Sequence, residues 1–233
     1  MLLWTGVERL VIGGPTGLVE SARTLVPKAI ALGKLRRDLG VLAAEIDAVG
    51  SDDDAFADLY ERVGLKGAKR RVDRAKLAES LFASEEENRL LLAPLYERDA
   101  RLIQWWWSLR DRLMNRQPEA ISGFFEESRQ RHEWQVLRLY RARNAVAHGV
   151  RAPVWLGDLI RHAHFYLTEL VAIAVHYREE ASDRAAYDIL AERAAQYDVF
   201  LQLAQAGVPT ALAAGTLVRP TILVGPHELP GGS

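Results

Sequence analysis

Glycine and proline divide this chain into long segments whose apolar residues recur every three to four positions. That period places side chains on one face of an α-helix, whereas a strand requires alternation. The pattern therefore predicts an all-α protein. The expected helices cover residues 2–12, 18–33, 34–49, 52–63, 84–114, 118–148, 158–179 and 182–206, with Pro27 as a break and Pro94 as a kink.

The length and composition are those of an ordinary globular protein. A chain of 233 residues with 49% apolar and 26% charged residues can bury a sizeable core. We expect one helical domain over residues 1–207, followed by an irregular tail over residues 208–233 that is rich in glycine and proline. Residues 216–224 could add one edge strand, although a loose tail fits their composition better.

Several classes of function are excluded by what the sequence lacks. Without cysteine the chain can form no disulfide, thiol nucleophile or cysteine-based metal site, and we expect neither a metal nor a cofactor. The longest apolar stretch, residues 167–175, is too short to span a membrane, so we expect a cytoplasmic protein without a membrane partner. The chain starts abruptly with Leu2, Leu3 and Trp4, which suggests a fragment of a longer protein or a mis-assigned start.

One segment places an arginine and a histidine five residues apart. On the helix that leads to it, Arg143 shares an apolar stripe with Val136, Leu139, Tyr140, Val146 and Ala147. A guanidinium on such a stripe requires an anion, because its desolvation is otherwise costly. His148 comes where Gly149 should end the helix, and the partial negative charge there favours the imidazolium. We therefore expect Arg143 to meet a carboxylate, a partner chain or a bound phosphate.

This pair of side chains suits metal-free cleavage of RNA. A histidine can remove the proton from an attacking 2′-hydroxyl or protonate the leaving 5′-oxygen, and a fixed cation can stabilise the phosphorane. Asn144 would orient the histidine or hold a phosphate oxygen, or else is a solvated helix residue. The chemistry thus makes Arg143, Asn144 and His148 the candidate catalytic residues.

The same segment resembles the signature of HEPN domains, close to the ApeA-like branch. The resemblance rests on Leu139-Tyr140-Arg141-Ala142-Arg143-Asn144-Ala145-Val146-Ala147-His148-Gly149, and it extends to the N-terminal helix at Trp4-Thr5-Gly6-Val7-Glu8-Arg9-Leu10. It implies an antiparallel helical bundle with additional helices, and a metal-independent endoribonuclease in a toxin or antiphage role. It also implies Glu8 as a partner for Arg143 and Tyr140 as a supporting residue. Glu20, just after the turn at residues 13–17, is the runner-up partner, and for each glutamate the alternative is an ordinary exposed side chain.

The resemblance further implies an antitoxin or a fused N-terminal regulatory domain as a candidate partner. In HEPN toxins that a nucleotidyltransferase silences, a tyrosine lies two places after the histidine. Val150 occupies that place here, so we expect no control by tyrosine modification.

RNA is the expected partner, and two basic regions are candidates to bind it. Residues 65–76 carry six cations against one acid, and residues 110–161 carry ten arginines against six acids. From these regions we select Lys69, Arg70, Arg71 and Arg141 as RNA-binding candidates, because such clusters can follow a phosphate backbone. The alternative is a solvated helix face balanced by nearby acids.

We also expect a homodimer through the motif face. Each chain has one motif histidine, whereas transesterification is best served by a separate base and acid. A two-fold axis would supply a second His148, and the apolar stripe would then be the interface.

Three tryptophans and two histidines also need an interpretation. Trp105, Trp106 and Trp107 spread around a helix, so at least one is partly exposed, at a dimer surface or stacked on RNA bases. His164 shares a stripe with Ile160 and Leu167, which predicts a hydrogen-bonded core histidine, and His132 is expected at the surface.

Two functions remain open. The chain is either a ribonuclease acting through Arg143 and His148, or a catalytically silent HEPN-type module that binds RNA, a nucleotide or another chain. In the second case Arg143 is a structural member of an ion pair.

Overall fold

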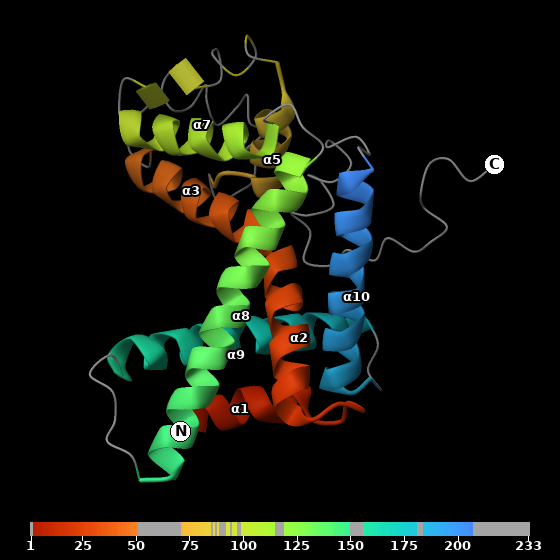
Figure 1. The fold of residues 1–233 in the computed structure, drawn as a ribbon. Helices are drawn as coiled ribbons and strands as arrows, with labels where there is room; N and C mark the ends of the chain where they lie inside the picture. Colours follow the sequence, from red (N-terminus) through yellow and green to blue (C-terminus); the bar gives the residue numbers. More distant parts are fainter. Residues whose placement is uncertain are drawn as a thin grey trace, which may run out of the picture. The chain divides into compact units, whose positions relative to one another are not determined.

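Figure 1 shows the computed structural model, in which all regular structure of the described residues is helical. The structure describes residues 2–50, 71–84, 99–114, 119–149, 156–180 and 184–206, together with residues 86, 88, 92, 93, 95 and 96. The all-α prediction is therefore confirmed for these residues. The helices are α1 (Leu2–Val11), α2 (Leu18–Leu32), α3 (Lys34–Gly50), α5 (Arg74–Phe82), α7 (Ala100–Met114), α8 (Glu119–Ala147), α9 (Leu156–Glu180) and α10 (Ala186–Gln205).

The chain falls into two compact units. Unit 1 comprises the described parts of residues 2–32 and 125–202, and unit 2 those of residues 33–124 and 203–206. The single domain over residues 1–207 stays a prediction. The expected helix over residues 52–63 and the tail over residues 208–233 lie outside the described residues.

Unit 1 is built around α1, which packs against α2 and α9. Trp4, Val7 and Val11 are buried along one face of α1, as the helical period requires. Gly6 allows the close approach to α9, because a Cβ there would lie 2.9 Å from Leu167 Cδ1. The buried cluster consists of Trp4, Val7, Val11, Ala22, Val26, Ala29, Ile30, Val136, Leu139, Ala142, Leu159, Ala163, Tyr166, Leu170 and Leu190.

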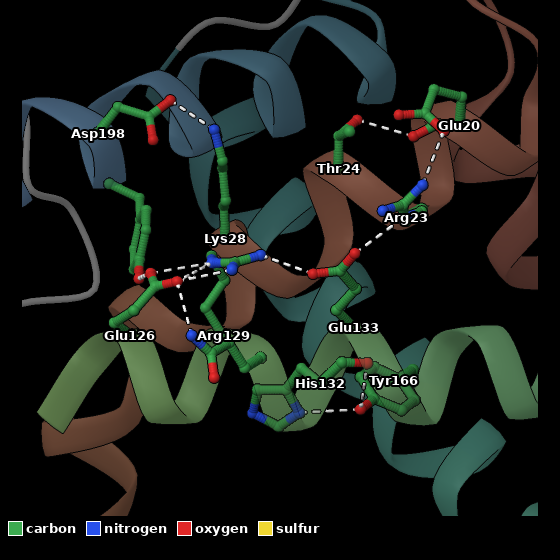
Figure 2. A network of polar contacts seen from close by, with 12 residues as sticks. Glu20, Arg23, Thr24, Lys28, Glu126, Arg129, His132, Glu133, Tyr166 and Asp198 are labelled. Carbon is green, nitrogen blue, oxygen red and sulfur yellow. Dashed lines mark hydrogen bonds and ion pairs between the residues drawn. The ribbon is translucent and has the colours of Figure 1, made fainter. Parts of the chain in front are cut away.

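A polar network joins α2, α8 and α10 inside unit 1 (Figure 2). Arg129 donates to Glu126 at 2.6 Å (Nη2 to Oε1) and to Glu133 at 2.8 Å (Nη1 to Oε2). Glu133 also accepts from Arg23 Nε at 2.8 Å, and Glu126 accepts from Tyr197 at 3.0 Å. The network fixes how α8 is rotated about its own axis, and α8 carries the motif at its C-terminal end.

Unit 2 packs α3, α5 and α7 together. Trp106 is buried there, with the Trp107 ring edge-on at 5.0 Å between centroids, and the Arg110 guanidinium lies over both rings. Trp105 and Trp107 are partly exposed. The prediction that three consecutive tryptophans cannot share one core is confirmed.

Two expected helix features are wrong. Residues 18–32 form one helix through Pro27, which lies buried within it, so packing offsets the backbone hydrogen bond that proline cannot donate. The helix expected over residues 84–114 is interrupted at Asp99, whose side chain accepts from the Arg101 backbone N–H at 2.9 Å. Asp99 thus caps the start of α7, as a short acidic side chain does at a helix N-terminus.

The two histidine predictions are also wrong. His164 is exposed, because α9 buries the neighbouring stripe of Leu159, Ala163, Tyr166 and Leu170 instead. His132 is partly buried, and its Nδ1 lies 2.8 Å from the Tyr166 hydroxyl (Figure 2). Two faces of α9 are apolar enough to pack against the core. The helical period of the sequence alone therefore could not predict which of them is buried.

Candidate functional site

The motif occupies the C-terminal end of α8, and the helix ends where the sequence predicted. The last helical residue is Ala147, and the His148 backbone N–H still bonds to the Asn144 carbonyl at 3.0 Å. Gly149 follows with φ of +73°, the left-handed conformation that glycine adopts at helix ends. The His148 side chain is exposed, so solvent and ligands can reach the imidazole.

Arg143 forms an ion pair with Glu8, the first of its two candidate partners. Its Nε lies 3.6 Å from Glu8 Oε1, and its Nη1 donates to Asn144 Oδ1 at 3.1 Å. The Arg143 side chain is 38% exposed while that of Glu8 is 9% exposed, so the carboxylate lies inside and the guanidinium at the rim. The runner-up, Glu20, pairs with Arg23 instead.

Trp4 holds the Glu8 carboxylate in place. The indole N–H donates to Glu8 Oε1 at 2.7 Å within the buried face of α1, and the Trp4 and Tyr140 rings lie 6.5 Å apart between centroids. Trp4 was missed as a supporting residue. Its spacing of four from Glu8, which places two side chains together on a helix, was the signal that could have found it.

The stripe that carries Arg143 mostly faces the chain's own core. Val136 and Leu139 are buried, Tyr140 and Val146 are partly buried, and only Ala147 is exposed. These buried residues are therefore not available as a subunit interface. The motif surface that remains accessible comprises the Arg143 rim and the exposed end of α8.

Arg143 and His148 leave the helix in different directions. Five residues of α-helix correspond to a rise of about 7.5 Å and a rotation of about 140°. The two side chains of one chain therefore do not project from the same side of α8. Asn144 accepts a hydrogen bond from Arg143 and is partly buried. Its angular position on the helix lies between those of Arg143 and His148.

The predicted RNA-binding residues do not form one described group. Lys69 and Arg70 lie outside the described residues. Arg71 is exposed in unit 2, and Arg141 is exposed on α8 in unit 1. Of these four, only Arg141 lies on the helix that carries the motif.

Sequence reasoning also missed Trp134, which is 69% exposed on α8. It precedes Arg143 by nine residues, or two and a half turns, and therefore lies on the opposite side of the helix. Its spacing from Arg138 and Arg141, four and seven residues, was the available signal.

Two features are absent from the described residues. They contain no group of three or more histidine, aspartate or glutamate side chains placed to hold a metal ion. None of the helices that they form is long and apolar enough to cross a membrane.

Comparisons with known proteins found no match for the chain. No protein-family model matches it, and neither a curated protein nor a solved structure is significantly similar to it.

Proposed function

We propose that the chain is a metal-independent endoribonuclease of HEPN type, which cleaves RNA by attack of a 2′-hydroxyl on the adjacent phosphorus. The observation that carries this proposal is the end of α8. There, an exposed imidazole at His148 follows a half-exposed guanidinium at Arg143 whose orientation is fixed by buried Glu8.

The reaction needs two proton transfers and one stabilised charge. The 2′-oxygen loses its proton and bonds to phosphorus, the bond to the 5′-oxygen breaks, and that oxygen takes up a proton. His148 performs one of the transfers, and Arg143 stabilises the phosphorane charge. Because these two side chains of one chain project from different sides of α8, the His148 and the Arg143 that act on one phosphate come from different chains of a dimer. The products are a 2′,3′-cyclic phosphate and a 5′-hydroxyl.

Arg143 suits charge stabilisation because its ion pair is incomplete. A single carboxylate oxygen at 3.6 Å is beyond ordinary hydrogen-bond distance, so the pair orients the guanidinium without using its N–H groups fully. A phosphate that arrives at the rim would meet a cation that contacts Asn144 and Glu8, and Trp4 in turn donates a hydrogen bond to Glu8. Such preorganisation lowers the cost of binding charge in the transition state.

A second His148 would complete the site. We propose that a homodimer brings two exposed α8 ends together, so that one imidazole acts as base and the other as acid. Only the accessible end of α8 and the Arg143 rim take part in this contact, since Val136 and Leu139 belong to the core. The proposals of a cytoplasmic location, a toxin or antiphage role and an antitoxin or fused regulatory partner rest on the HEPN resemblance.

The catalytically silent module is the second candidate, and the Glu8 ion pair favours it. An arginine that neutralises a buried carboxylate has a structural reason to be present without any catalysis. In that case RNA or another chain would bind, and no strand would be cut.

Cleavage of a labelled RNA in the presence of a chelator distinguishes the two. The enzyme should remain active without metal, yield the cyclic phosphate and lose about 100-fold or more in His148→Ala. His164→Ala is the matched control, because it removes another exposed histidine of unit 1. Activity that disappears with the chelator and returns with magnesium would exclude this mechanism.

A further inference from the structure

The outer face of α8 carries an unusual set of exposed side chains. From residue 130 to the end of the described helix region, none of the exposed residues is acidic. The central part of α8 does contain three glutamates. Glu126 and Glu133 are paired with Arg129, and Glu127 lies before this stretch. The exposed positions are Gln130, Arg131, Trp134, Arg138, Arg141, Ala147, His148 and Gly149.

Four of these positions form one stripe that leads towards the motif. Arg131, Trp134, Arg138 and Arg141 follow one another in steps of three and four, which keeps them on one side of the helix. Continued by the same steps, the stripe ends at His148, about 25 Å from Arg131 along the axis. Arg143 lies on the other side of α8, against Glu8, and is not part of the stripe.

An exposed indole lies among these arginines. Trp4 and Trp106 are each almost fully buried, whereas Trp134 leaves 69% of its surface in water. The exposed ring offers apolar surface that a stacked ligand can cover. A flat aromatic ring between cations is the combination with which proteins bind single-stranded nucleic acid, because the ring stacks on an unpaired base and the cations contact phosphates.

We infer that this stripe, Arg131, Trp134, Arg138 and Arg141, binds single-stranded RNA and leads it to His148. Trp134 stacks on one base, and the three arginines contact the phosphates on either side. A duplex is disfavoured, since its bases are already stacked and cannot cover the indole. The choice of RNA over DNA rests on the proposed function, whereas the single-strand binding follows from the stripe itself.

Binding is measured with the full-length His148→Ala variant, so that cleavage does not remove the probe. A fluorescently labelled RNA of twelve nucleotides and mixed sequence is titrated at several salt concentrations, and fluorescence anisotropy gives the dissociation constant. Trp134→Ala should weaken binding about tenfold without changing the salt dependence, and Trp134→Phe should retain most of the affinity. Tyr96→Ala is the control, because Tyr96 is a similarly exposed aromatic residue of unit 2.

The arginines should show the opposite behaviour. Each of Arg138→Gln and Arg141→Gln should weaken binding at low salt and reduce the slope of log K against log salt by about 0.7. Arg9→Gln, which removes an exposed arginine from α1, should leave both quantities unchanged. Thermal melting of each variant verifies that the fold persists.

Failure of this inference is distinguishable from failure of the proposed function. Equal affinity of the His148→Ala protein and its Trp134→Ala derivative would overturn the stripe, even if the wild type cuts RNA. Tight binding that depends on Trp134 and Arg141 in a chain that never cuts would uphold the stripe and refute the nuclease. Equal affinity for a duplex of the same sequence would overturn the assignment to single strands. If the stripe bound an acidic protein but no RNA, the whole inference would be overturned.

Discussion

Two arginines on nearly the same side of α8 have very different surroundings. Arg129 donates to two carboxylates at 2.6 and 2.8 Å, and its side chain is 22% exposed. Arg143, fourteen residues later, has one carboxylate oxygen at 3.6 Å and is 38% exposed. The first arginine is saturated by its own chain, while the second retains the capacity to bind a further anion. The comparison shows that two arginines of one helix can differ in how fully the chain's own carboxylates pair with them.

The largest expected effect concerns catalysis at the unsaturated arginine. Arg143→Ala should lower kcat about 10²- to 10³-fold, the usual loss for one group that stabilises transition-state charge. At a temperature where the variant is folded, Arg129→Ala should leave kcat nearly unchanged, because the Arg129 guanidinium is already bound to two carboxylates of its own chain. Steady-state kinetics on a labelled RNA measures both. Equal losses in the two variants would remove the distinction between the two arginines.

Stability should follow the reverse order. Arg129→Ala leaves Glu126 and Glu133 close together without their shared cation, which should cost roughly 2 kcal/mol, between the values for surface and buried pairs. Arg143→Ala should cost roughly 1 kcal/mol, because Trp4 still donates to Glu8 and the guanidinium is partly solvated. Urea unfolding gives both values. A loss of 3 kcal/mol or more at Arg143 would instead favour the silent module.

The saturated network also predicts how stability depends on pH. The hydrogen bond from Arg129 holds the pKa of Glu126 below its ordinary value of 4.5, and the one from Arg23 does the same for Glu133. Because both folded pKa values lie below the unfolded ones, their stabilisation is complete above about pH 4.5 and is lost as the pH falls through the folded values. Unfolding midpoints measured from pH 7 down to pH 3 should therefore decrease less in Arg129→Ala than in the wild type. Parallel decreases would show that the network does not control the acid transition.

The smallest effect is expected where an ion pair is well formed but exposed. Lys28 Nζ lies 2.6 Å from Asp198 Oδ2, yet the two side chains are 29% and 50% exposed. Lys28→Gln should therefore change the free energy of unfolding by about 0.5 kcal/mol or less, and the change should vanish in high salt. A loss as large as that of Arg129→Ala would mean that exposure does not decide the strength of these pairs.

Local features of the site could be predicted from the sequence because short-range chemistry determines them. Gly149 ends α8 since only glycine adopts its φ without strain, and this fixes His148 at the exposed end. The pairing of Arg143 with Glu8 required the HEPN resemblance, since no periodicity relates α8 to α1. The catalytic roles of Arg143, Asn144 and His148 stay predictions.

Within the described residues, the sequence by itself predicted most of the helices, many of their ends, and which side chains share a face, but it did not predict α5 (Arg74–Phe82). The tertiary structure alone decided which face meets the core. On α9, both the stripe with Leu159 and Tyr166 and the stripe with Ile160 and His164 are apolar, and packing against α1 and α2 selected the first. The same selection brought His132 inward and left Trp134 in solvent. The physical reason is that a helical period is a property of one segment, whereas burial depends on the surfaces that other segments present.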